Sequence, residues 1–384
     1  MKLLIAGAQG QLGRDCAALL APQHEVIGLD LPGFDISIEQ QVDNAVGSLQ
    51  PDVIINCAGF TAVDDCETSR DLAWKANALG PLHFARAARR TGAILVHIST
   101  DYVFDGTHPY PVPYLENDEP HPLSWYGETK LAGEKAVAAN AERFIILRTA
   151  WLYGRHGRNF PKTILRLALK HPERALRVIN DQYGSPTWSH RLAAQISKAI
   201  ASDCQGVYHS TAEGYCTWHA FATRFLALMK VEHVLTPCRT DEYPTAAKRP
   251  ANSILENGRL KAAGVNVMRE WDVDLAEFVA TFGDELLKAF CARLGSTFES
   301  QVALARLSGD TFALLGRTEM VNPESLSQLT AAVLQVQSQM VTVSATCGLV
   351  RLEAGNTGGA DILKHAHVAL KIAKVQHRGG SMYY

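Results

Sequence analysis

Short apolar runs alternate with helical patterns through the first half of the chain. Such runs are typical of strands that a fold buries on both faces, and they lie at 3–6, 25–29, 52–57, 94–98 and 144–147. Helical spacing of apolar positions fills the intervals at 11–20, 38–49, 73–90 and 127–139. Strand and helix alternating at this spacing predict an α/β fold with a doubly wound parallel sheet.

The pattern becomes less regular after about Trp151, where prolines separate shorter elements. Two helical patterns, at 191–201 and 218–228, flank a short apolar strand at 206–210. We expect this region to form a smaller lobe interleaved with the main sheet.

Composition narrows the class of protein. The chain has 384 residues, more than one ordinary core, and a formal net charge of -2, so nothing favours nucleic acid or a membrane surface as partner. No apolar run approaches the roughly 20 residues that span a bilayer. The eight cysteines are scattered without a CxxC pair, which indicates reduced thiols and no metal site. We therefore predict a cytoplasmic protein.

Three glycines form a GxxGxxG pattern between the first strand and the first helix: Gly7, Gly10 and Gly13. Glycines there permit a tight turn and a close approach of the backbone to a pyrophosphate at the helix N-terminus. Asp30 ends the second strand, where a carboxylate binds the adenosine ribose and favours NAD over NADP. Packing glycines and a turn carboxylate are the plainer alternatives.

Tyr126 and Lys130 lie four residues apart, which places both on one face of a helix. Reduction of a ketone needs a proton donor, and a nearby ammonium together with an oxidised nicotinamide brings a phenol closer to the working pH. Thr100 ends an apolar strand, where it can donate to the same carbonyl oxygen. A solvated helix face and a capping hydroxyl are the alternatives.

An ordered set of motifs then makes a resemblance specific. GAQGQLG, NCAGFTAVDDCE, HISTDYVFDG, PLSWYGETKLAGE, LRTAWLYGRHGRNF, VINDQYGSPTW, GVYHSTAEGYCTWHAFA and YPTAAKRPANSIL occur in this order. Residues 1–282 resemble the dTDP-4-dehydrorhamnose reductases, a family of extended short-chain dehydrogenases. The resemblance implies a Rossmann-type NAD(P)-binding domain over 1–150, completed by parts of 189–215, and a substrate-binding lobe over 151–282.

The resemblance also implies roles for individual residues. NADPH or NADH would be bound by Gly7, Gly10, Gln11, Leu12, Gly13, Asp30, Asp35, Ile36, Ala58, Gly59, Thr61, Tyr126 and Lys130. Thr100, Tyr126 and Lys130 would be catalytic, with Tyr126 giving its proton to O4 of a 4-keto sugar. That sugar nucleotide would contact Thr100, Val103, Phe104, Trp151, Asn159 and Arg249. A core aromatic is the alternative for Trp151.

The implied activity is reduction of dTDP-4-dehydro-L-rhamnose to dTDP-L-rhamnose, a supply step for surface polysaccharide. A sugar-nucleotide dehydratase or epimerase is one alternative, but dehydratases resemble a Thr-Asp-Glu arrangement, and Tyr102 stands at the third position here. A non-catalytic NAD(P)-binding regulatory subunit is the other. The resemblance leaves a homodimer open.

Residues 283–384 resemble the second half of a GGDEF (diguanylate cyclase) domain. The resemblance rests on GDELLKAFCARL, ALARLSGDTFALLG, VTVSATCGLVRL and ADILKHAHVALKIAKVQHRGGSMYY. The pattern predicts a partial α+β module: a helix, a hairpin with Ser308-Gly309-Asp310 at its tip, a helix over 323–337, a strand, a helix over 360–376 and a final short strand. A docking role on a protein partner fits this truncated module.

We predict that this module makes no cyclic dinucleotide. Joining two GTP molecules into a cyclic dinucleotide needs carboxylates that hold Mg²⁺ against the triphosphate. Thr311 stands where the resemblance implies a metal-binding glutamate, and Ser308 replaces the first glycine of the signature. Incubation of the purified protein with GTP and Mg²⁺ should give no cyclic di-GMP. Product that Asp310→Ala abolishes would contradict the prediction.

Overall fold

The computed structural model describes residues 1–170 and 173–281, with short stretches between residues 302 and 383. The chain divides into two compact units, Met1–Val279 and Ala280–Tyr384. Within the described residues, no helix combines the length and the apolar character that crossing a bilayer requires.

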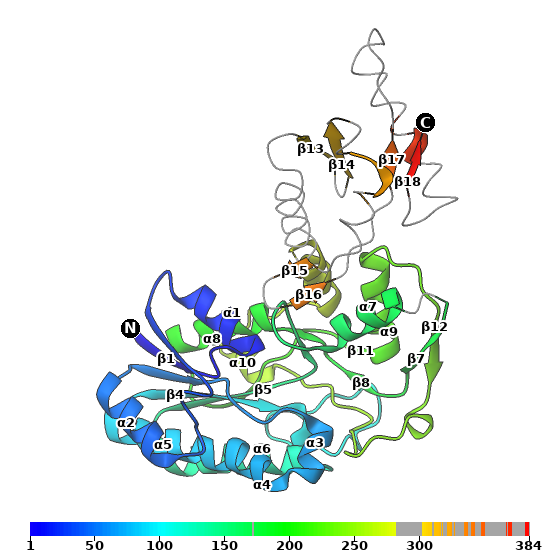
Figure 1. Cartoon of the computed structure of the whole chain (residues 1–384). Helices are drawn as coiled ribbons and strands as arrows, with labels where there is room; N and C mark the ends of the chain where they lie inside the picture. The colour runs from blue at the N-terminus through cyan, green and yellow to red at the C-terminus, as the bar shows by residue number, and fades with distance from the viewer. Residues whose placement is uncertain are drawn as a thin grey trace. The chain divides into compact units, whose positions relative to one another are not determined.

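A six-stranded parallel sheet forms the centre of the first unit (Figure 1). Its strands, in spatial order, are β10 (Gly206–His209), β5 (Phe144–Thr149), β4 (Ile94–Thr100), β3 (Val53–Asn56), β1 (Lys2–Ala6) and β2 (Glu25–Leu29). The order reverses between β1 and β3, and doubly wound sheets bind ligands at the carboxyl ends of the strands at such a switch point. The predicted doubly wound α/β fold is confirmed.

Alternate side chains of the strands pack against opposite helical layers. Leu3 and Ile5 share one core with Leu12 and Ile196, whereas Leu4 belongs to a second core with helices on the other face. The first layer contains α1 (Gln11–Leu20) and α8 (Ser189–Ala201), and the second contains α2 (Glu39–Leu49), α5 (Gly80–Thr91) and α6 (Trp125–Asn140).

The helix predicted over 73–90 is present and runs without a break over residues 70–91, with a π-helical turn inside it. Short helices α3 (Val63–Thr68) and α4 (Arg70–Trp74) lead into a π-helical turn, η1 (Lys75–Leu79), before α5. Pro81 has no N–H to donate to the carbonyl of Asn77, which favours a wider turn at this point. That carbonyl instead lies close against α6, where a Cβ added to Gly133 would be 2.2 Å from it.

A second lobe of this unit contains small two-stranded sheets. β6 (Leu152–Tyr153) pairs with β9 (Thr187–Trp188), β7 (Leu176–Ile179) with β12 (Leu235–Cys238), and β8 (Tyr183–Gly184) with β11 (Cys216–Thr217). The helices here are α7 (Phe160–Lys170), α9 (Trp218–Leu228) and α10 (Gly258–Ala262), with a 3-10 turn η3 (Thr240–Glu242). Residues 271–281 are also helical.

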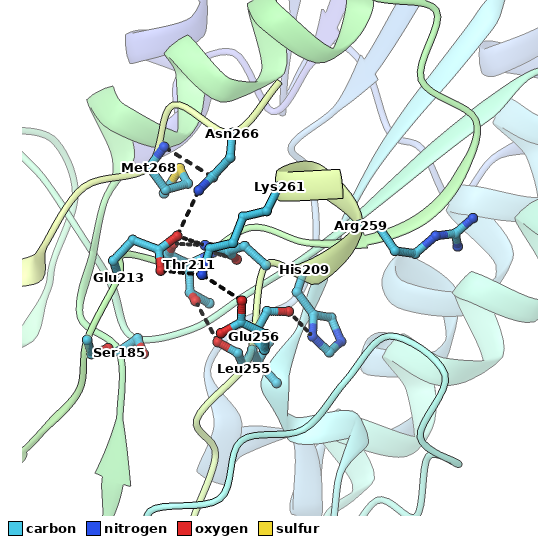
Figure 2. A network of polar contacts seen from close by, with 12 residues as sticks. Ser185, His209, Thr211, Glu213, Leu255, Glu256, Arg259, Lys261, Asn266 and Met268 are labelled. Carbon is cyan, nitrogen blue, oxygen red and sulfur yellow. Dashed lines mark hydrogen bonds and ion pairs between the residues drawn. The ribbon is translucent and has the colours of Figure 1, made fainter. Parts of the chain in front are cut away.

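A polar network joins the segment after β10 to the segment that carries α10 (Figure 2). Glu213 accepts hydrogen bonds from the side chains of Asn257 and Asn266, at 3.0 and 2.8 Å, and forms an ion pair with Lys261 at 2.9 Å. Thr211 donates to the carbonyl of Leu255 at 3.4 Å. These bonds fix the chain where it passes from the sheet into the second lobe.

In the second unit, β13 (Ala303–Ser308) and β14 (Thr311–Leu315) form the predicted hairpin. Its tip residues Gly309 and Asp310 lie outside the described residues, as do 282–301 and most of the helix predicted over 360–376. The helix predicted over 323–337 is too long, because β15 (Leu334–Val336) pairs antiparallel with β16 (Gln339–Val341). Valines at both ends of this pair favour extended backbone. β17 (Cys347–Leu349) pairs with β18 (Ser381–Tyr383), the predicted final strand.

A buried ion pair joins α6 to the sheet. Arg148 of β5 contacts both carboxylate oxygens of Glu134, with Nη2 2.7 Å from Oε2 and Nε 2.9 Å from Oε1. Both side chains are 5% exposed, and the Ser99 hydroxyl of β4 donates to the same carboxylate at 2.5 Å. Removing one partner of such a pair leaves an uncompensated charge in the interior.

We predict that Arg148→Met lowers the free energy of unfolding of the first unit by about 3–5 kcal/mol. The control is Arg86→Met, which breaks an ion pair to Glu39 whose side chains are each 47% exposed, and which should cost about 0.2–1 kcal/mol. All six tryptophans lie in the first unit, so urea unfolding followed by their fluorescence measures it. Equal losses in the two variants would contradict the prediction.

Candidate active site

The glycine loop between β1 and α1 is packed too closely for any side chain. Gly7 has a φ of +75°, and a Cβ there would lie 2.7 Å from the backbone nitrogen of Ala58. A Cβ on Gly13 would lie 2.1 Å from the carbonyl oxygen of Gly7. Helix α1 starts at Gln11, directly after Gly10, without an acidic residue in its first turn. Bare backbone beside a helix N-terminus fits a pyrophosphate, so these residues fit a dinucleotide.

Asp30 fixes this loop from the neighbouring strand. Its carboxylate accepts hydrogen bonds from the backbone N–H of Gln9, at 2.7 Å, and of Leu31, at 2.8 Å. The side chain is half-buried at the carboxyl end of β2, where the sequence predicts the ribose contact. The turn role that the sequence offered as an alternative is therefore present, and the ribose contact stays a prediction.

Asp35 and Ile36, two of the residues predicted to bind the cofactor, differ in exposure. Asp35 is half-buried and accepts a hydrogen bond from the backbone N–H of Ser37 at 2.8 Å. The Ile36 side chain is buried in the core and packs over Gly80 of α5, so its side chain has a structural role. Leu12 is likewise a core residue of α1.

The segment after β3 lies beside α6, the helix that carries Lys130. Ala58 donates its N–H to the Asn56 side chain at 3.1 Å, and Gly59 and Thr61 are exposed. A Cβ added to Gly59 would be 3.9 Å from the Lys130 ammonium. The structure thus brings the predicted cofactor-binding residues after β3 and Lys130 to one edge of the sheet.

The three predicted catalytic residues converge at the carboxyl end of β4. Thr100 ends that strand, while α6 supplies Tyr126 in its first turn and Lys130 in its second. Ser124 caps the helix by accepting the N–H of Gly127 at 3.3 Å. All three catalytic candidates are at most 8% exposed.

Burial shifts the acidity of these groups in opposite senses, because it disfavours the charged form of each. It raises the pKa of Tyr126, against which the neighbouring Thr100 hydroxyl acts. Burial lowers the pKa of Lys130 to about 8, although the Glu134 carboxylate opposes the change. The Lys130 ammonium donates to the carbonyl of Ile98 at 2.5 Å, so the structure holds it against β4.

Sequence reasoning missed Asn77, which connects the two sides of this site. Its side-chain amide donates to the carbonyl of Phe60 and to the Thr129 hydroxyl, at 3.0 and 3.1 Å, and its oxygen accepts the N–H of Phe60 at 2.9 Å. The available signal was an asparagine, a poor helix former, between two alanines in a helical pattern. Asn77 thereby fixes the loop after β3 against α6.

The predicted sugar contacts after β4 are enclosed in protein. Val103 ends the 3-10 turn η2 (Asp101–Val103) and Phe104 follows it. Both side chains are 0% exposed and pack with Tyr114, Leu131 and Leu255. Their side chains therefore belong to the core, which leaves only their backbone to border a ligand.

Trp151 has the left-handed backbone that non-glycine residues rarely adopt, with a φ of +46°. Its ring stacks on Trp218 with centroids 3.5 Å apart and an interplanar angle of 7°. Gly184 provides the space beneath, because a Cβ there would lie 2.5 Å from the indole. Trp151 is half-buried, so one part of the ring is available to a ligand.

The two remaining substrate candidates are bonded to the dinucleotide side of the molecule. Asn159 donates to the Gln11 side chain at 2.8 Å. Arg249 forms a two-point ion pair with Asp64, with nitrogen–oxygen distances of 2.7 and 3.1 Å. Its positive charge also opposes the rise in the pKa of Tyr102 that burial causes. The structure thus places both residues between the lobes of the first unit, and their contact with a diphosphate stays a prediction.

Known proteins match the chain in two parts. The family described as "RmlD substrate binding domain" matches residues 1–283, and "Diguanylate cyclase, GGDEF domain" matches residues 280–380. The dTDP-4-dehydrorhamnose reductase of Salmonella typhimurium is 40% identical over 288 residues, covering 71% of this chain and 95% of the relative.

Solved structures agree with this match. A dTDP-4-dehydrorhamnose reductase from Clostridium acetobutylicum has a TM-score of 0.71 and 43% identity, covering 73% of this chain and 99% of that one. The Bacillus anthracis reductase in complex with NADP has a TM-score of 0.70 and 37% identity, with the same coverage. Both resemblances stated from the sequence are confirmed.

We predict that Gly13→Ala weakens NADPH binding by at least about tenfold, or about 1.4 kcal/mol. The added methyl group would strike the Gly7 carbonyl, which is backbone and has little room to move. Gly47→Ala is the matched control, because nothing lies within 4 Å of its added Cβ. Titration calorimetry with NADPH measures both variants. Unchanged affinity in Gly13→Ala would refute the fit of this loop to the pyrophosphate.

Proposed function

Because the chain belongs over residues 1–283 to the RmlD substrate binding domain family, we propose that it reduces dTDP-4-dehydro-L-rhamnose to dTDP-L-rhamnose. The chain is an NAD(P)H-dependent oxidoreductase, in agreement with the reductases that it resembles over almost their whole length. The product is a nucleotide sugar for polysaccharide biosynthesis.

The convergence of Thr100, Tyr126 and Lys130 beside the glycine loop carries this proposal. NADPH or NADH supplies the hydride that reduces C4 of the sugar. Tyr126 gives its proton to O4, and its raised pKa keeps the phenol protonated until the oxygen becomes basic. The Thr100 hydroxyl donates to the same oxygen. Lys130, held on the Ile98 carbonyl, orients the cofactor and provides positive charge near the phenol.

The rest of the site favours reduction over the rival reactions. Tyr102 packs edge-on against Tyr126, with ring centroids 5.5 Å apart, where water elimination would need a second carboxylate. Burial raises the pKa of Tyr102, so this phenol is a poor base for proton removal. A non-catalytic regulator would not need Thr100, Tyr126 and Lys130 together, and turnover distinguishes the two.

A homodimer and a docking role for the C-terminal unit are further parts of the proposal. Both rest on the sequence, since the resemblance leaves a dimer open and a truncated sheet presents an unpaired edge. The molar mass of the full chain in solution tests the homodimer. Comparison of partner binding by the full chain and by a chain ending at residue 281 tests the docking role.

We predict that the purified protein oxidises NADPH only in the presence of a dTDP-4-keto sugar. Tyr126→Phe should lower kcat by about 10²–10⁴ and change NADPH affinity little, because it removes the proton donor and keeps the ring. The control is Tyr110→Phe, since Tyr110 is 50% exposed. Absorbance of the reduced nicotinamide follows turnover. Near-native kcat in a folded Tyr126→Phe protein would exclude Tyr126 as the proton donor, and tight NADPH binding without turnover in the unmodified protein would favour the regulator.

A further inference from the structure

The Thr100 hydroxyl has one proton and more than one possible acceptor. Its Oγ1 donates to Oδ1 of Asp101 at 3.0 Å and accepts the backbone N–H of Tyr102 at 3.2 Å. When the Thr100 hydroxyl donates its hydrogen bond to Asp101, it offers only a lone pair to Tyr126 or to a substrate oxygen. In that arrangement Thr100 cannot stabilise the negative charge that develops on a carbonyl oxygen during reduction.

Asp101 is a buried carboxyl that the mechanism does not use. It is 2% exposed, and its Oδ2 has no hydrogen-bond partner among the described residues. The nearby Ser253 hydroxyl is within hydrogen-bonding distance of the Tyr183 carbonyl, at 3.3 Å. A buried carboxylate with so few partners is costly, and a proton taken up on Oδ1, the oxygen that faces Thr100, removes the charge.

We propose that Asp101 is a positioning residue whose proton sets the direction in which the Thr100 hydroxyl donates, a role that rests on the proposed reductase function. Ionised Asp101 accepts the hydrogen bond that the Thr100 hydroxyl donates. Protonated Asp101 donates its own O–H to Thr100 Oγ1, which turns the Thr100 proton toward Tyr126 and the sugar O4. The protonated state therefore assembles the full set of donors around the oxygen that is reduced.

The surroundings place this change near neutral pH. Burial raises the pKa of Asp101 to about 6, although the neighbouring hydroxyls of Ser253 and Thr100 oppose the rise. The groups that face this part of the site are Tyr102 from the same turn, Tyr126 from α6, Ser253 and Arg249 from the second lobe, and Asp64 and Cys66 from α3. Arg249 and Asp64 neutralise each other as an ion pair, so no unpaired charge from either opposes protonation.

The sign of the pH dependence follows from the raised pKa. Below pH about 6, Asp101 holds its proton and Thr100 donates to the substrate. As the pH rises through that value, the carboxylate forms and withdraws the Thr100 donor, so kcat falls. The loss should reach up to about 10²-fold, the lower bound for removal of one donor to a developing oxyanion. The KM for NADPH should not follow the same curve.

The test is the pH profile of kcat in the full-length protein and its variants. Asp101→Asn keeps the shape and cannot ionise, and its amide can donate to Thr100, so the fall through pH about 6 should disappear. Thr100→Val should lose the fall as well, and adding Asp101→Asn to it should leave the profile unchanged. Asp71→Asn, which removes an exposed carboxylate, should keep the native profile. A native profile in Asp101→Asn would overturn the proposal.

A measurement without turnover separates this proposal from the reductase function. Infrared difference spectra between the native protein and Asp101→Asn report the carboxylic acid directly, and the acid band should disappear as the pH rises through about 6. No such band at pH 5 would overturn the role of Asp101 even in an active reductase. A titrating band in a protein that does not reduce the sugar would instead contradict the reductase function alone.

Discussion

The attachment of α6 to β4 and β5 is the interaction on which the site depends. Three residues spaced four apart, Tyr126, Lys130 and Glu134, lie along one face of this helix and meet the sheet. Glu134 is held by Arg148 and Ser99, and Lys130 by the Ile98 carbonyl. These bonds fix both the height and the rotation of the helix, so Tyr126 has one position relative to Thr100.

The same packing that positions these groups also sets their acidity. Removing water raises the pKa of Tyr126 and of Asp101 and lowers that of Lys130, because each charged form loses hydration. Burial thereby brings the pKa of Asp101 to about 6 and that of Lys130 to about 8, nearer to neutral, whereas Tyr126 stays a protonated phenol. The charges of the buried pair Glu134–Arg148 compensate each other, so this pair leaves no net charge beside the site.

Two polar contacts couple the two lobes of the first unit. Asn159 of the second lobe bonds to Gln11 at the start of α1, and Arg249 bonds to Asp64 beyond β3. A shift of Gln11, directly after Gly10, would therefore displace Asn159 in the second lobe. The GGDEF-related unit adds a hairpin and further strand pairs to this reductase.

The sequence alone determined the fold class, and it predicted the three residues that the structure brings together at the carboxyl end of β4. Strictly local signals carried that information: buried strand runs, glycines before a helix, and a tyrosine and lysine four residues apart. Only the tertiary structure revealed the role of Asn77, because its partners Phe60 and Thr129 come from other elements. It also placed the side chains of Ile36, Val103 and Phe104 in the core, because apolar residues beside a site and beneath it look alike in a sequence.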